Sequence, residues 1–183
     1  MLRLALFSLG LVSLPVLAHD HDHAHHHNAA AHQHGLGHLD LVLEGEQLLL
    51  ALHMPAADLL GFEHAPRTAR QHQQVAALQE QLQQPQGLFR LPAAAQCSLD
   101  SAQLDSSLFA EEPRSGDDAH SEHEHADISA HYQFSCAGPQ QLQQLDVLLF
   151  ERFPGSETLL LQAITPTGQQ GGELNARNNR VRL

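Results

Sequence analysis

The chain has 183 residues, which is one domain's worth of sequence once an N-terminal export signal is set aside. Its formal net charge is −12 with the histidines neutral, and no lysine cluster offsets that charge. This charge disfavours nucleic acid and anionic lipid surfaces as partners, and it favours cations.

The first 18 residues have the pattern of a secretory signal peptide. Arg3 gives a basic start, residues 4–17 are an apolar run too short to span a bilayer comfortably, and Ala18 offers a small residue for cleavage. We therefore expect export to the periplasm, with His19 as the mature N-terminus. No later segment reaches the roughly 20 apolar residues of a membrane helix, so no membrane attachment is expected after cleavage.

Sixteen histidines stand out in the composition, against one tyrosine and no tryptophan. Nine of them fall between His19 and His38, and residues 19–34 lack apolar periodicity, which predicts a disordered tail. Neutral imidazole is the commonest nitrogen ligand of zinc, and a His-x-His pair in an extended chain projects both rings to one side. The zinc ligands predicted in this tail are His19, His21, His23, His25, His26, His27, His32 and His34. The alternative interpretations are a solubilising tail and an added affinity tag.

Leucines at every second position predict a β-hairpin directly after the tail, with strands over 38–44 and 47–54 and a tight turn at Gly45. The register that sets leucine against leucine also places His38 opposite His53. Opposed Cβ atoms in such a pair lie roughly 4.5 to 5.5 Å apart. We therefore predict both histidines as zinc ligands, although a single exposed histidine is more often not a ligand.

The clearest helix is predicted over about 68–84. Thr68 and Gln71 have the spacing of a capping box, apolar residues follow at helical intervals, and Pro85 ends the helix. Further strands are predicted at 96–104, 127–134, 145–152, 157–164 and 178–183. The expected fold over residues 35–183 is a mainly β, α+β domain, an antiparallel sheet or sandwich with this one principal helix.

A second polar segment, over 111–126, is predicted to be a surface loop rich in histidine, aspartate and glutamate. Its candidate zinc ligands are His120, His123 and His125. The alternative is a loop that is merely acidic. His131 faces outward with Ser129 from the following strand, and it suits a ligand or a bystander equally. The isolated His64 and His72 are not assigned as ligands.

Two cysteines, Cys97 and Cys136, predict one disulfide in an exported chain. That bond removes thiolates from the available ligands, and Met54 is the only methionine beyond the initiator, so copper(I) sites are disfavoured. A mature terminus with His21 as its third residue suits copper(II) or nickel(II), which we expect to bind in vitro. The sequence has no H-E-x-x-H, G-x-S-x-G or G-x-G-x-x-G motif, so no enzymatic activity is predicted.

Four features together carry a family resemblance: the histidine tract, His-Gln-His-Gly at 32–35 before an alternating strand, the segment PAADLLGFEHAP at 55–66, and the later cysteine pair. In these the chain resembles the ZrgA-like family of zinc-regulated periplasmic proteins. The resemblance implies zinc-responsive expression and support of an ABC-type zinc importer by delivery of zinc to its periplasmic binding protein. It also implies metal binding by His120, His123 and His125, which lie in a segment similar to the family's acidic, histidine-rich insert, at 117–127. The alternative function is a periplasmic buffer against excess zinc, nickel or copper.

Overall fold

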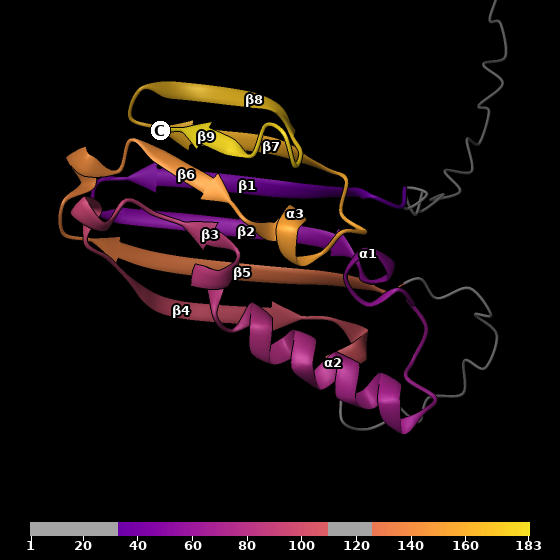
Figure 1. The fold of residues 1–183 in the computed structure, drawn as a ribbon. Coiled ribbons are helices and arrows are strands. Elements are labelled where there is room, and N and C mark those ends of the chain that lie inside the picture. The colour runs from indigo at the N-terminus through magenta and orange to yellow at the C-terminus, as the bar shows by residue number, and fades with distance from the viewer. Residues whose placement is uncertain (1–32, 110–125) are drawn as a thin grey trace, which may run out of the picture. The chain divides into compact units, whose positions relative to one another are not determined.

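A six-stranded sheet is the largest element of the structure, a computed structural model that describes residues 33–109 and 126–183. Its strands lie in the order β4-β5-β2-β1-β7-β8 (Figure 1). Neighbouring strands are antiparallel except for β1 and β7, which are parallel. The bounds are β1 Leu36–Glu44, β2 Gln47–Pro55, β4 Cys97–Asp105, β5 Asp127–Cys136, β7 Thr158–Thr165 and β8 Gly168–Leu174.

A smaller sheet and the helices cover one face of the large sheet (Figure 1). The small sheet has the order β3-β6-β9, with β3 Phe89–Arg90, β6 Gln144–Val147 and β9 Arg180–Arg182. The helices are α1 Ala56–Leu60, α2 Ala69–Leu82 and α3 Leu149–Arg152, and short 3-10 turns lie at 85–87, 93–95, 107–109 and 139–141. The apolar core lies between these two layers, so the opposite face of the large sheet is left to solvent. We call these the inner and the outer face.

The predicted hairpin of β1 and β2 is confirmed with its predicted register. Leucine pairs with leucine along the inner face, and His38 pairs with His53. Gly45 occupies the turn with φ 58°, a left-handed conformation that costs glycine little. Gly37 serves another purpose, because a Cβ at this position would lie only 2.0 Å from the Met54 sulfur. The glycine therefore allows β1 to pack closely just before His38.

The predicted helix is confirmed as α2, and its N-terminus carries the predicted capping box. The Thr68 side chain accepts a hydrogen bond from the Gln71 N–H, and the Gln71 side chain accepts one from the Thr68 N–H. At its other end, α2 is tied to the large sheet because the buried Tyr132 hydroxyl donates to the Leu82 carbonyl at 2.9 Å. Burial also raises the pKa of Tyr132, which keeps this hydroxyl protonated as a donor.

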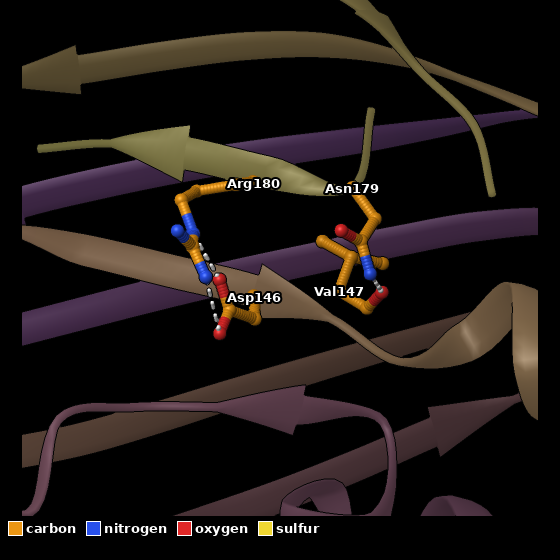
Figure 2. A network of polar contacts seen from close by, with 4 residues as sticks. All are labelled: Asp146, Val147, Asn179 and Arg180. Carbon is orange, nitrogen blue, oxygen red and sulfur yellow. Dashed lines mark hydrogen bonds and ion pairs between the residues drawn. The ribbon is translucent and has the colours of Figure 1, made fainter. Parts of the chain in front are cut away.

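Polar contacts join the last two strands of the small sheet (Figure 2). Arg180 on β9 donates from Nε to Asp146 Oδ1 at 2.6 Å and from a second nitrogen to Oδ2 at 3.3 Å. This guanidinium holds the pKa of Asp146 below its ordinary value. Asn179 donates its side-chain amide to the Val147 carbonyl at 3.0 Å. The C-terminal strand is thereby fixed beside β6.

The fold differs from the sequence prediction in four respects. The strand predicted at 145–152 ends at Val147, and its second half is the helix α3. The strand β8 was not predicted, because its residues GQQGGEL lack the β-branched and aromatic residues that favour strands. The short strand β3 was not predicted either. The parallel pairing of β1 with β7 is a long-range contact that no local pattern encodes.

Some predictions concern residues outside the described part of the chain: the signal peptide at 1–18, nearly all of the tail at 19–34, and the loop at 111–126 except its last residue. Within residues 33–109 and 126–183, no helix is long and apolar enough to cross a membrane.

Candidate metal centre

The outer face of the six-stranded sheet is rich in groups that attract cations. Its strands alternate, so that buried residues point inward while histidines, acids and amides point outward. None of the six strands contains an arginine or a lysine. The ionisable residues of these strands, apart from the inward-pointing Tyr132, are His38, Asp40, Glu44, His53, Asp100, Asp105, Asp127, His131 and Glu173.

Two of these histidines stand side by side on neighbouring strands. His38 on β1 and His53 on β2 are directly paired and exposed, as the sequence predicted. Their ring centroids lie 6.5 Å apart, and the ring planes are inclined at 56°. The fold thus places two imidazoles next to each other at one end of the sheet.

His53 has polar neighbours on both ring nitrogens, and both neighbours come from β5. Its Nδ1 lies 2.9 Å from Ser129 Oγ, because Ser129 is its ladder partner. Its Nε2 lies 3.4 Å from Asp127 Oδ2. Asp127 is two residues before Ser129, on the same face of β5. The side chain of His53 is 49 % exposed and that of Asp127 is 24 % exposed. At this corner of the sheet, His53 is therefore half exposed to solvent, and Asp127 is partly exposed beside it.

Another histidine of the predicted set, His34, lies just before β1. Its Nδ1 is 3.9 Å from Oδ1 of Asp58, a carboxylate on α1 that is almost completely buried. The Gly35 N–H donates to both oxygens of Asp58 at 2.9 Å. Burial raises the pKa of Asp58, while the Gly35 hydrogen bond and the charge of His34 act to lower it. Asp58 thus anchors the chain where the histidine-rich N-terminal segment enters the fold.

Both histidine-rich segments of the sequence adjoin this same end of the sheet. Gln33 precedes the first residue of β1, and its carbonyl accepts the Leu36 N–H. Ala126 is the last residue of the second segment and is immediately followed by Asp127. Its N–H donates to the Glu63 carbonyl, and its carbonyl accepts the Ala56 N–H. The described chain therefore begins at Gln33 and resumes at Ala126 at the end of the sheet where His53 stands.

The remaining predicted ligands divide into those the structure places and those outside it. His19, His21, His23, His25, His26, His27, His32, His120, His123 and His125 are outside the described residues. Among residues 33–109 and 126–183, no group of three His, Cys, Asp or Glu side chains stands close enough, as placed, to hold a metal ion. The described part of the chain therefore contains the pair of His38 and His53 with the Asp127 carboxylate nearby, and no complete set of metal ligands.

The isolated histidines have local surroundings of their own. His64 stacks on Phe62 with ring centroids 5.3 Å apart, and its Nδ1 lies 2.8 Å from the Ala65 carbonyl. His72 is exposed on α2, and His131 is exposed on β5 two residues beyond Ser129. None of the three is part of a ligand group among the described residues.

The contacts of Asp127 and Ser129 with His53 were not predicted from the sequence. The predicted strand at 127–134 did place Ser129 on the outward side with His131. The neighbouring strand could not be predicted, because a single sequence does not show that β5 pairs with β2. The register of that pairing sets Ser129 opposite His53.

The predicted disulfide is confirmed. Cys97 at the start of β4 and Cys136 at the end of β5 are ladder partners and are bonded. The bond lies at the end of the strands opposite to the His53 corner, because β5 begins at Asp127 and ends at Cys136. Because the cysteines are bonded to each other, neither is available as a metal ligand. The disulfide is also remote from His38 and His53.

One comparison with known proteins identifies a family, and another gives no match. A family model described as ZrgA family zinc uptake protein matches residues 31–183, which is most of the chain. The chain belongs to this family, as its sequence features predicted, and the family name connects it with zinc uptake. No curated protein matches the chain.

Proposed function

We propose that this member of the zinc uptake family is a periplasmic accessory protein that captures zinc and supports an ABC-type importer by passing zinc to the importer's binding protein. Zinc is then cargo, bound by the clustered histidines of the sequence. The observation that carries the proposal is the match to a zinc uptake family over 31–183 in a chain with sixteen histidines. We propose no catalytic activity.

The distribution of charge supports a role in collecting cations. The outer face of the sheet carries six acidic residues, three histidines and no arginine or lysine along its strands. A surface of one sign raises the local concentration of the opposite ion and its rate of arrival. Free zinc is scarce where an uptake system is needed, so such a face adds to the capture of zinc by the histidines.

The position of the histidine-rich segments supports the same role. The described residues Gln33 and Ala126 adjoin these segments and lie at the end of the sheet where His38 and His53 stand. Imidazoles carried by these adjoining segments, together with the fixed pair His38 and His53, would let a zinc ion exchange between ligands without leaving the protein. Exchange of this kind is what delivery to another protein requires.

Zinc titration of the full mature chain by calorimetry tests whether it holds cargo. We expect more than one zinc ion per chain at pH 7.5, with affinity falling steeply towards pH 5.5 because protons compete for imidazole near a pKa of about 6.5. A single site whose affinity is the same at both pH values would contradict binding by clustered histidines.

A periplasmic buffer against excess zinc, nickel or copper is the alternative, because the same ligands could hold metal without passing it on. Expression separates the two functions: an uptake protein is induced by a zinc chelator, whereas a buffer is induced by added metal. The transfer of zinc from the loaded protein to the purified importer binding protein, followed by a fluorescent zinc indicator, tests delivery itself. Failure of transfer together with induction by excess metal would favour the buffer.

A further inference from the structure

We propose that His38, His53 and Asp127 form a zinc site built into the fold, separate from the histidine-rich segments of the sequence. The inference rests on the proposed function only in taking zinc as the metal. Its new content is a fixed site on the outer face of the sheet, with a carboxylate as one ligand and a serine that orients one of the histidines.

The distance between His53 and Asp127 is the first observation that supports the site. Two donors at about 2.0 to 2.1 Å from one tetrahedral zinc ion lie about 3.3 Å from each other. Nε2 of His53 and Oδ2 of Asp127 are 3.4 Å apart. This separation is longer than a normal hydrogen bond of about 2.7 to 2.9 Å between charged groups, and it matches two ligands on one ion.

Ser129 prepares His53 for this role. A metal-binding histidine commonly uses its second ring nitrogen to donate to an oxygen, which fixes the tautomer and the ring orientation. Nδ1 of His53 lies 2.9 Å from Ser129 Oγ. With the proton on Nδ1 donated to the serine, Nε2 keeps its lone pair and faces Asp127.

His38 supplies the third donor after a small movement. Two imidazoles bound to one tetrahedral zinc have ring centroids about 5 Å apart, from a metal–nitrogen distance of about 2.0 Å. The rings of His38 and His53 are 6.5 Å apart. Because both side chains are exposed, rotation about their side-chain torsions can close this gap of about 1.5 Å without moving the strands.

The coordination number suits cargo. Three protein ligands leave one position of a tetrahedral zinc to water or to an incoming ligand, whereas structural zinc sites are closed by four. The acidic strands around the corner, which contain no arginine, also offset the charge of the ion. Zinc at this corner would therefore be held by the fold and still be open to exchange.

The competing explanation is an ion pair between protonated His53 and Asp127 that never binds metal. A full-length chain with asparagine at the predicted ligands outside this corner separates the two. The substituted positions are His19, His21, His23, His25, His26, His27, His32, His34, His120, His123 and His125. Zinc titration of this chain at pH 7.5 should still give one equivalent.

Added to that chain, His53→Ala should abolish binding, and Asp127→Asn should weaken it about 10-fold or more. Ser129→Ala should weaken it by about 10-fold, the lower end of the usual effect of losing such a partner. The matched control is His131→Ala, an exposed histidine on the same face of β5, which should leave the affinity unchanged. Binding that survives His53→Ala, or no binding before any of these changes, would overturn the site.

Nuclear magnetic resonance of the unmodified chain gives a second readout that does not depend on the substitutions. Zinc should shift the ring signals of His38 and His53 and leave those of His72 on α2 unchanged. Unshifted His53 signals at saturating zinc would also overturn the site. If the unmodified chain binds zinc and only this corner does not, the proposed function stands and the inference fails; if the unmodified chain binds no zinc, both fail.

Discussion

The inner and outer faces of the six-stranded sheet are made by the same strands and have opposite chemistry. Along β2 the residues Leu48, Leu50 and Leu52 are at most 2 % exposed, whereas Leu49 is 43 % exposed and His53 faces solvent. The inner face packs against the small sheet and α2, and the outer face carries the histidines and acids. Alternation along a strand thus assigns stability to one face and leaves the other for ligands.

This difference implies that stability and zinc binding can be changed separately. The core consists of apolar side chains and a disulfide, neither of which needs a metal ligand, so the metal-free protein should be folded. Changes on the inner face should lower the free energy of unfolding and leave zinc binding by the folded protein unchanged. Changes on the outer face should do the reverse.

The largest expected loss of stability comes from removing the disulfide. Cys97 and Cys136 are 39 residues apart, and the chain-entropy model gives a loop of this length about 4 kcal/mol. The double variant Cys97→Ala, Cys136→Ala should unfold roughly 10 °C lower, measured by circular dichroism without metal. Its zinc stoichiometry should equal that of the parent. Parent protein reduced with dithiothreitol is the control, and an unchanged midpoint in both would contradict the expected role of the bond.

A paired substitution on β2 contrasts the two faces directly. Leu50→Ala on the inner face should lower the free energy of unfolding by about 3 kcal/mol, because the side chain is 1 % exposed and its loss leaves a cavity. Leu49→Ala on the outer face is its neighbour in sequence and should cost less than about 1 kcal/mol, because the side chain is already 43 % exposed. Urea titration measures both, and equal losses would refute the assignment of the faces.

The pH dependence of stability tests the contact between Asp58 and Gly35, which anchors the chain just before β1. Its pKa in the folded state is raised, so its contribution to stability is fully present below the unfolded pKa of about 3.9 and is lost as pH rises through the folded pKa. Asp58→Asn cannot ionise, and its amide oxygen can still accept the Gly35 N–H. Between pH 4 and pH 7, measured with chelator present, the parent should therefore lose stability relative to this variant. A difference between the two proteins that does not change with pH would disprove the raised pKa.

The smallest expected effect on stability belongs to the predicted ligands of the second histidine-rich segment. Replacing His120, His123 and His125 by alanine should remove part of the zinc capacity and leave the metal-free unfolding midpoint within a few degrees of the parent. Circular dichroism with and without a chelator measures the second effect, and calorimetry the first. Loss of the β signal on removing zinc from the parent would show that the metal is structural.

Local patterns in the sequence were sufficient for several elements of the fold. The alternating leucines predicted β1, β2 and the pairing of His38 with His53, and the Thr68–Gln71 spacing predicted the start of α2. The two cysteines predicted the disulfide. Each of these follows from side-chain periodicity, from hydrogen bonds within a few residues, or from the number of reactive partners available.

Tertiary structure decided what lies beside these elements. Which strands neighbour the hairpin depends on packing between residues far apart in the chain, so the sequence alone could not show that Ser129 and Asp127 on β5 meet both nitrogens of His53. The same holds for β7, which lies parallel to β1, and for β8, whose glycines and glutamines form a strand only because β7 offers its edge. The sequence by itself determined that this chain carries many zinc-binding side chains, since composition and spacing are local. Only the fold decided that Asp127 stands beside the pair of His38 and His53, since that depends on the register of strands separated by more than 70 residues.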